Sequence, residues 1–246
     1  MKVPGTLQPV FAIQRSTQRA YFDHGWLKTH HSFSFAEYRD SSNVNWGALR
    51  VFNDDYVEGG RGFPPHPHRD MEIVTYVLSG ELVHEDSIGN RGVVAAGGVQ
   101  FMSAGTGVTH SEFNNKADQT LHFVQMWVLP GRVGLPPSYG QMEFAAEARR
   151  NRWLRIVSGQ DGVEAPIRIT QQATLSVARL EDASLVHEFL PKRFGFLFVA
   201  DGIVEANGER LQTGDAVRTY DVAQLAVKGY GEIVLWDLPD AALPPS

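Results

Sequence analysis

The chain has 246 residues, of which 22 are Lys or Arg and 28 are Asp or Glu, so its formal net charge at pH 7 is −6. This length, with 43% apolar residues, is typical of a globular protein with one large domain or two small ones, and it excludes a mainly disordered chain. The acidic balance without a Lys/Arg cluster argues against direct binding of nucleic acid, and the lack of cysteine excludes disulfides, thiolate nucleophiles and Cys-ligated metals.

The first segments in chain order give no targeting or membrane signal. The apolar run at residues 10–13 is shorter than the ~7–15 residues that a secretory signal needs, so we expect a cytoplasmic protein. The longest stretch without Asp, Glu, Lys or Arg, residues 92–111, contains five glycines and several polar side chains. We therefore predict turns and short strands there, and no membrane span.

Short apolar segments separated by Gly and Pro predict an all-β fold. Strands are predicted at residues 46–52, 72–78, 121–129, 152–157, 174–180, 193–199 and 232–236, with turns at 79–80, 89–90, 201–202, 207–208 and 213–214. Residues 143–150 are the single helical candidate. We therefore expect antiparallel β-sheet almost throughout the chain.

A repeat in outline divides the chain into two units. The pattern at residues 76–80, 90, 97–98 and 126–130 recurs at 198–202, 207, 213–214 and 235–239. Such self-similarity indicates two β units of about a hundred residues each. The Pro- and Gly-rich residues 130–140 suit a connection, so we predict an N-terminal domain at 1–140 and a C-terminal domain at 141–246.

The histidines place the chemistry in the first unit, because eight of the nine lie within the first 122 residues. His66, His68 and Glu72 lie at even spacing, which on one strand would put the three side chains on the same face. A second pair with the same spacing, His110 and Glu112, follows a glycine-rich segment whose bends can bring it against the first. Three imidazoles and a carboxylate suit Fe(II), Mn, Ni, Cu or Zn more than Ca or Mg.

Four segments resemble a known family: HGWLKTHHSFSFAEY, HPHRDMEIVTYVLSGELVHEDSIGN, AGTGVTHSEFN and QMWVLP. Across roughly its whole length the chain resembles the pirins, which are two-domain proteins of the cupin superfamily. The resemblance implies a bicupin made of two antiparallel jelly-roll β-barrels. It also implies one divalent metal ion in the first barrel, held by His66, His68, His110 and Glu112, with water or substrate completing its shell.

The sequence leaves the roles of two further residues of the first unit, Glu72 and His84, less defined. Glu72 occupies the position of the glutamate ligand in the general cupin pattern, whereas the pirins take theirs from the position of Glu112. We therefore expect Glu72 beside the ligands or as a displaced ligand. His84 is expected to make a hydrogen bond at the surface or in a turn.

The second barrel is expected to hold no metal. At its positions equivalent to the first-barrel ligands stand Glu188, Leu190 and Ala226, and His187 is one residue out of register. A shift of one residue turns a strand side chain to the opposite face. We therefore expect the C-terminal domain to support the first one, as the resemblance also implies.

The resemblance implies quercetin 2,3-dioxygenase activity, in which O2 opens the central ring of a flavonol and carbon monoxide is released. Glu112 would be catalytic as the base that takes the proton of the flavonol 3-hydroxyl, beside a metal that acts as Lewis acid and template. Fe(II) is the first choice for this chemistry, and Ni, Mn, Cu, Co and Zn are alternatives. The expected partners are thus a flat enol-type small molecule and O2.

Two other functions fit the same features. The resemblance also covers regulators that bind a protein partner, in which the metal state would act as a switch. The third alternative is a metal-dependent isomerase or hydrolase, because cupin barrels host many chemistries and the fold alone does not decide among them.

Overall fold

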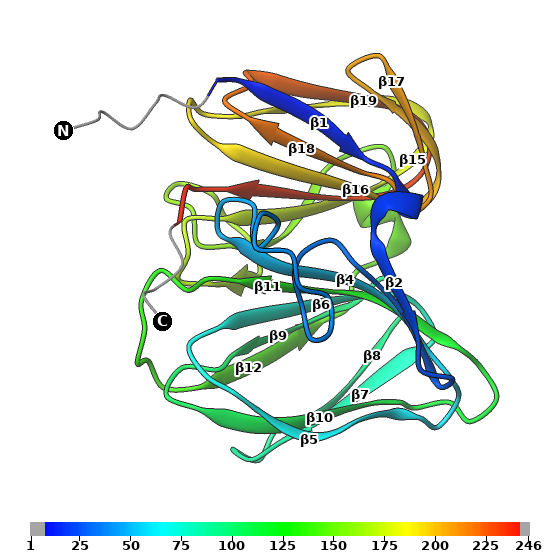
Figure 1. The fold of residues 1–246 in the computed structure, drawn as a ribbon, viewed down its shortest axis with the longest axis vertical. Coiled ribbons are helices and arrows are strands. Elements are labelled where there is room, and N and C mark those ends of the chain that lie inside the picture. The colour runs from blue at the N-terminus through cyan, green and yellow to red at the C-terminus, as the bar shows by residue number, and fades with distance from the viewer. Residues whose placement is uncertain (1–7, 242–246) are drawn as a thin grey trace.

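The computed structural model describes residues 8–241, and these residues form mostly β-strands. Three sheets stack as layers, with a seven-stranded sheet between a four-stranded and an eight-stranded sheet (Figure 1). The all-β prediction is confirmed. Among residues 8–241, no helix has the length and apolarity needed to cross a membrane.

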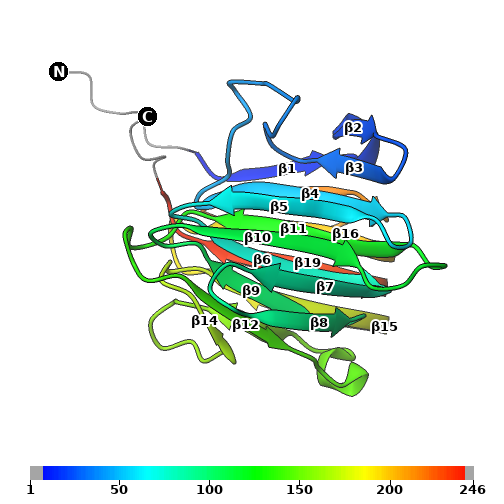
Figure 2. The ribbon, with the colours of Figure 1, turned by 90° about the horizontal axis from the view of Figure 1, so that it is seen from below.

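The four-stranded and the seven-stranded sheets belong to the N-terminal part of the chain and face each other. In spatial order the four-stranded sheet contains β5 (Gly62–His68), β10 (Val108–Asn114), β7 (Glu81–Asp86) and β8 (Arg91–Ala95). The seven-stranded sheet contains β12 (Ser138–Met142), β9 (Val99–Ser103), β6 (Glu72–Ser79), β11 (Leu121–Val128), β4 (Leu49–Val57), β3 (Leu27–His31) and β2 (Ala20–Asp23). Figure 2 shows the smaller sheet lying in front of the larger one.

The third sheet contains the strands of the C-terminal part and the first strand of the chain. Its path runs through β1 (Val10–Gln14), β18 (Ala216–Tyr220), β16 (Phe194–Ala206), β19 (Gln224–Leu238), β15 (Thr174–Glu188), β13 (Leu154–Ser158) and β14 (Ile167–Arg168), with β17 (Glu209–Gln212) paired to β16. The pair of β13 and β14 is parallel, whereas the other strand pairs of the described chain are antiparallel.

Each predicted strand overlaps an observed one, namely β4, β6, β11, β13, β15, β16 and β19 in chain order. The last three are longer than predicted because their pairing continues past bulges near residues 182 and 200 into a half-exposed region. The helical prediction at residues 143–150 is wrong, since this segment holds only the 3-10 turn η2 (Ala146–Arg149). Its N-cap residue, Ala145, offers no side-chain oxygen to the first turn.

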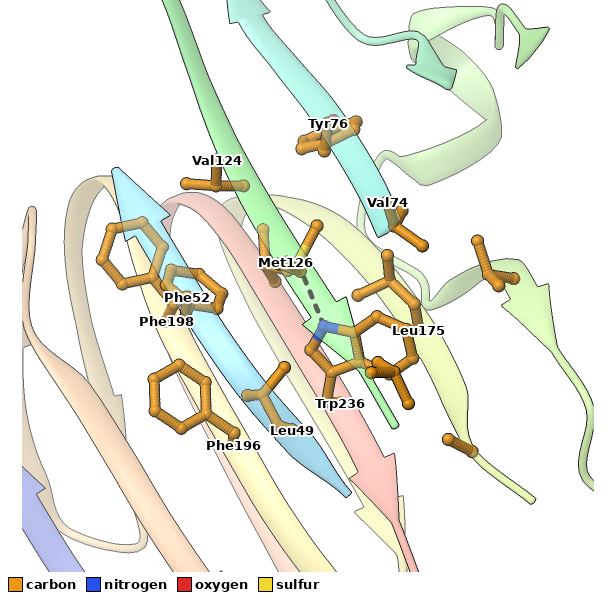
Figure 3. Close-up of a cluster of buried hydrophobic side chains, with 14 of the residues drawn as sticks. Leu49, Phe52, Val74, Tyr76, Val124, Met126, Leu175, Phe196, Phe198 and Trp236 are labelled. Carbon is orange, nitrogen blue, oxygen red and sulfur yellow. Dashed lines mark hydrogen bonds between the residues drawn. The ribbon is translucent and has the colours of Figure 1, made fainter. Parts of the chain in front are cut away.

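The largest apolar core lies between the seven-stranded and the eight-stranded sheets. Phe52 and Met126 from the former pack against Phe196, Phe198 and Trp236 from the latter (Figure 3). The buried indole Nε1 of Trp236 donates to the sulfur of Met126 at 3.0 Å. The N-terminal and C-terminal parts thus share one core and support each other.

Side chains on β6 alternate between the two faces of the seven-stranded sheet, so every second one points away from the shared core. Val74 and Tyr76 point to the shared core, so Ile73, Thr75 and Val77 point to the space between the seven-stranded and four-stranded sheets. That space contains the candidate site described below.

The predicted domain boundary lies inside a strand. Residue 140 belongs to β12, which pairs with β9 of the seven-stranded sheet. At the other end of the chain, β1 pairs with β18 of the C-terminal sheet. The division into domains 1–140 and 141–246 stays a prediction, with β12 spanning the boundary and β1 pairing into the C-terminal sheet.

Candidate functional site

Three imidazoles meet between β5 and β10. His66 and His68 lie two residues apart on β5 and share a face, and His110 on β10 is the direct cross-strand neighbour of His66. The ring centroids of His66 and His110 are 4.5 Å apart, and those of His68 lie 4.8 Å from each. One nitrogen of each ring lies within 4.8 Å of the other two, which is close enough for a single ion.

The hydrogen bonds of these rings leave nitrogens free for a metal. His66 Nδ1 donates to the carbonyl oxygen of Pro64 at 2.8 Å, so its Nε2 carries the lone pair. Nε2 of His110 is buried and has no hydrogen-bond partner among the described residues. Burial, followed by the neighbouring imidazoles, lowers the pKa of His110 to about 3 and that of His68 to about 4. Neutral imidazoles with unshared lone pairs fit a divalent transition metal.

Glu112 lies two residues after His110 on β10 and is buried beside it. Its carboxylate accepts hydrogen bonds from the side-chain amides of Gln100 on β9 and Gln125 on β11, the latter at 2.7 Å. Its ligand oxygen lies within 4.8 Å of nitrogens of His84 and His110. The structure thus gathers the predicted residues in two groups that share His110, with Glu112 in the second group.

Gln100 and Gln125 were not identified from the sequence. They belong to a row of inward-facing polar side chains in one cross-strand register, which runs through His31, Asn53, Gln125, Thr75 and Gln100. Gln100 and Gln125 each interrupt an otherwise apolar strand at a position that faces the interior. Because a buried amide needs a hydrogen-bond partner, a single Gln at such a position was the sequence signal for a buried polar contact.

The structure contradicts the expectation that His84 lies at the surface or in a turn. His84 is fully buried on β7, directly opposite Glu112 on β10. Its Nε2 donates to Asp86 at 3.0 Å and its Nδ1 lies 3.3 Å from Nδ1 of His110. The reason is strand alternation, because Leu82 and His84 both face inward from β7.

These contacts define the tautomers. A proton on Nε2 of His84, held by Asp86, leaves Nδ1 of His84 as an acceptor. Nδ1 of His110 then donates to it, and the lone pair of His110 is on Nε2, the atom that has no partner within residues 8–241. Asp86 and His84 therefore orient His110 for metal binding.

We expect His84→Ala to weaken metal binding by about 10–100-fold, which is the usual cost of removing a group that orients a metal ligand. The measurement is competition with a chelator of known affinity. His122→Ala is the matched control, because His122 is also largely buried but contacts Asp54 instead of the candidate ligands. Equal metal affinities of the two variants would contradict the orienting role.

Glu72 does not lie beside the candidate ligands, so that expectation is wrong. The chain turns at Asp70, whose φ is +46°, and passes from β5 into β6 of the facing sheet. On β6 Glu72 shares its face with Val74 and points toward the C-terminal part. Its carboxylate accepts hydrogen bonds from the backbone N–H of Thr170 at 2.6 Å, the hydroxyl of Thr170 and the N–H of Gln171.

Glu72 therefore holds the N-terminal and C-terminal parts together. Glu72→Ala should lower the free energy of unfolding by about 1–3 kcal/mol, because three donors lose a buried acceptor. The metal content of this variant should match that of the unmodified chain. Thr170→Val removes one of the three donors and should cost less. Denaturant unfolding and elemental analysis check both results, and a loss of metal in Glu72→Ala would show that the carboxylate acts at the metal centre.

A cavity of about 330 Å³ opens beside the imidazoles. His66, His68 and Glu112 line it together with aromatic and proline side chains. The apolar part is formed by Leu27, Phe35, Phe63, Pro64, Pro65 and Trp127. An apolar molecule with one metal-binding end suits this lining, because ligand pockets combine apolar walls with a few placed polar groups.

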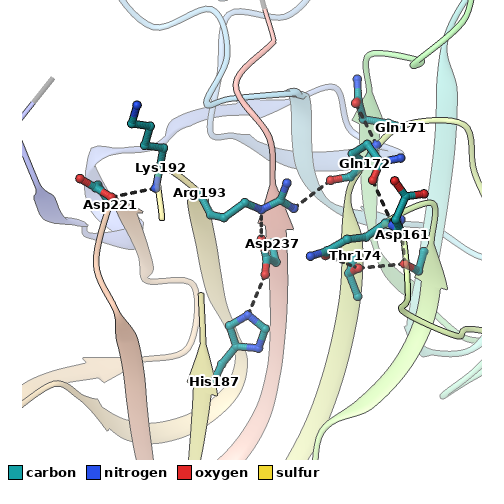
Figure 4. Close-up of polar contacts among 11 residues, drawn as sticks. Asp161, Gln171, Gln172, Thr174, His187, Lys192, Arg193, Asp221 and Asp237 are labelled. Atoms are coloured by element: carbon teal, nitrogen blue, oxygen red, sulfur yellow. Dashed lines mark hydrogen bonds and ion pairs between the residues drawn. The ribbon is translucent and has the colours of Figure 1, made fainter. Parts of the chain in front are cut away.

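The C-terminal part offers a different environment around its one histidine, His187. His187 Nε2 donates to Asp237 at 3.0 Å, and Arg193 donates to the other oxygen of the same carboxylate at 2.6 Å (Figure 4). This histidine is thus hydrogen-bonded to a carboxylate that also pairs with Arg193. The two groups of candidate metal ligands found within residues 8–241 both lie in the N-terminal part.

Comparisons with known proteins agree with this architecture. Residues 12–128 match the family described as Pirin, and residues 155–235 match the family described as Quercetinase C-terminal cupin domain. A quercetin 2,3-dioxygenase of Escherichia coli strain K12 is 38% identical over 230 residues, which cover 92% of this chain and 98% of that protein. A pirin-like protein of Caulobacter vibrioides is 42% identical over 219 residues, or 87% of this chain and 94% of that one.

Solved structures lead to the same family. The crystal structure of YhhW from Escherichia coli has a TM-score of 0.87 and 37% sequence identity, and it covers 96% of this chain and 100% of that one. Bacterial pirin YhhW in complex with nickel(II) has a TM-score of 0.86 at the same identity, with 94% and 100% covered. The predicted bicupin fold is confirmed.

Proposed function

The chain belongs to the pirin family, and on that premise we propose that it is a metal-dependent dioxygenase that opens the central ring of a flavonol such as quercetin with O2 and releases carbon monoxide. The observation that carries the proposal is the meeting of three imidazoles beside a cavity that a buried carboxylate and aromatic side chains line. The relatives named quercetin 2,3-dioxygenase support the choice of substrate.

We assign one divalent metal to His66, His68, His110 and Glu112 in the predicted N-terminal domain, and a supporting role to residues 141–246. Fe(II) is the first choice, and the nickel(II) complex of YhhW supports nickel as an alternative. When bound, such an ion supplies Lewis acidity and a template for O2 and the enol.

The residues of the chain supply the proton chemistry. Glu112 lines the cavity and takes the proton of the flavonol 3-hydroxyl. The amides of Gln100 and Gln125 fix the orientation of this carboxylate. Phe35 and Trp127 flank the cavity in an edge-to-face arrangement, with ring centroids 5.3 Å apart, and they keep water from the flat substrate.

The test uses protein loaded separately with iron, nickel and manganese. We expect loss of flavonol absorbance with equimolar O2 uptake and carbon monoxide release for at least the iron form, and none for metal-free protein. Intact quercetin in all three forms, together with metal-dependent binding of a protein partner, would favour the regulatory alternative. Turnover with zinc and without O2 would instead indicate an isomerase or hydrolase.

A further inference from the structure

The cavity has a second polar wall, on the sheet that faces β5 and β10. Asn53 and Asp55 lie two residues apart on β4, so both side chains point inward. Their cross-strand neighbours on β3 are His31 and Thr29. All four line the same cavity as His66 and Glu112, and each is nearly buried. The wall therefore approaches the cavity from the sheet opposite the imidazoles of β5.

Part of this wall has no protein partner. Oδ1 of Asn53 and Nδ1 of His31 are buried and make no hydrogen bond with any residue between 8 and 241. Gln125, the next residue in the same cross-strand row, has partners for both of its polar groups. Its amide donates to Glu112, and its oxygen accepts from the indole of Trp127 at 3.1 Å. Because unpaired buried polar atoms are costly, their gathering on a cavity wall points to a ligand that completes them.

We propose that Asn53, Asp55 and His31 form a hydroxyl-binding subsite, which selects substrates that carry hydroxyl groups on a ring other than the one that meets the metal ligands. This inference rests on the proposed function, because it names the substrate class of the same cavity: flat polyphenols with hydroxyls at both ends.

The chemistry of the wall favours neutral hydroxyl groups. The amide oxygen of Asn53 only accepts hydrogen bonds, so its partner must be a donor. Burial and the nearby Arg19 lower the pKa of His31 to about 4, which leaves a neutral ring. Burial, followed by the charges of Asp54 and Glu112, raises the pKa of Asp55 to about 7. Neither Lys nor Arg from residues 8–241 lines the cavity, so this lining offers phosphate and carboxylate groups no counter-charge.

The test measures binding and does not need turnover. Zinc-loaded protein is titrated under exclusion of O2 with quercetin and with 3-hydroxyflavone, which keeps the metal-binding end and lacks the other hydroxyls. We expect quercetin to bind about ten-fold or more tightly, because a site with unpaired polar groups discriminates against a ligand that cannot satisfy them.

Asn53→Leu and Asp55→Asn should weaken quercetin binding toward that of 3-hydroxyflavone and leave 3-hydroxyflavone binding unchanged. Asn53→Ser serves the same purpose if the leucine variant fails to fold. Asn43→Ala is the control, because Asn43 bonds to the carbonyl oxygen of Ser32 outside the cavity lining. Thermal melting verifies the fold of each variant.

Equal affinity of the unmodified chain for the two flavonols, or an equal loss for both ligands in the variants, would overturn the subsite. Selective binding of quercetin without its cleavage would support the subsite and contradict the proposed dioxygenase activity. Cleavage of both flavonols with equal kcat/KM would support the dioxygenase activity and contradict the subsite.

Discussion

Replacing His66 and His68 together with alanine is expected to reduce the metal content of the protein from about one ion per chain to almost none. The two imidazoles supply two of the three nitrogens that meet between β5 and β10, and a transition-metal ion retains little affinity for the one that remains. Elemental analysis of dialysed protein is the measurement.

The double variant should still fold. Both histidines are only half-buried, and the pairing of β5 with β10 uses backbone groups that alanine leaves intact. Its metal-free form is therefore expected to melt close to the metal-free form of the unmodified chain. His187→Ala is the control, since it removes an imidazole that is bonded to Asp237 in the C-terminal part. Metal that survives the double substitution, or two ions per unmodified chain, would contradict a single site.

The sequence predicted the parts of this site that follow from alternation within one strand. His66 and His68 are two residues apart on β5, and His110 and Glu112 are two apart on β10, so each pair shares an inward face. The predicted turns at 79–80, 89–90, 207–208 and 213–214 each separate two observed strands, whereas the turn predicted at 201–202 is wrong, because β16 continues through a bulge there. The apolar runs at residues 72–78 and 121–129 match β6 and β11 closely.

Even spacing failed where the chain changes sheets. Glu72 continues the numerical pattern of His66 and His68, but the turn at Asp70 places it on β6 with its side chain toward the C-terminal part. Sequence spacing has no meaning across such a turn, because the two strands belong to facing sheets. The role of Glu72 depends on Thr170 and Gln171, about a hundred residues away in the chain.

Gln100 and Gln125 were missed, and His84 was assigned to the surface or a turn, because the role of each depends on a cross-strand neighbour. His84 is opposite Glu112, and the two glutamines come from β9 and β11 to the same carboxylate. A single sequence does not tell which strands pair, so it cannot distinguish a buried amide that orients a carboxylate from one at the surface. The pairing order of the strands supplies this information.

The second large effect concerns Glu112, whose replacement by Gln should lower flavonol turnover by about 10²–10⁴-fold, the usual contribution of a general base. The side chain keeps its size, and the amide of Gln100 can turn to present its oxygen, which has no partner among residues 8–241, to the new donor. The fold should therefore change little. His66, His68 and His110 still offer three nitrogens, so most of the metal should remain.

Comparison with Glu72→Gln separates a role in turnover from a role in structure. Glu72 lies on the opposite face of the seven-stranded sheet, so its Gln variant should lower the free energy of unfolding and leave kcat per metal ion nearly unchanged. For Glu112→Gln we expect the opposite: a large loss of kcat at nearly unchanged melting temperature and flavonol affinity. If Glu72→Gln costs more turnover per bound metal than Glu112→Gln, the catalytic carboxylate has been assigned to the wrong strand.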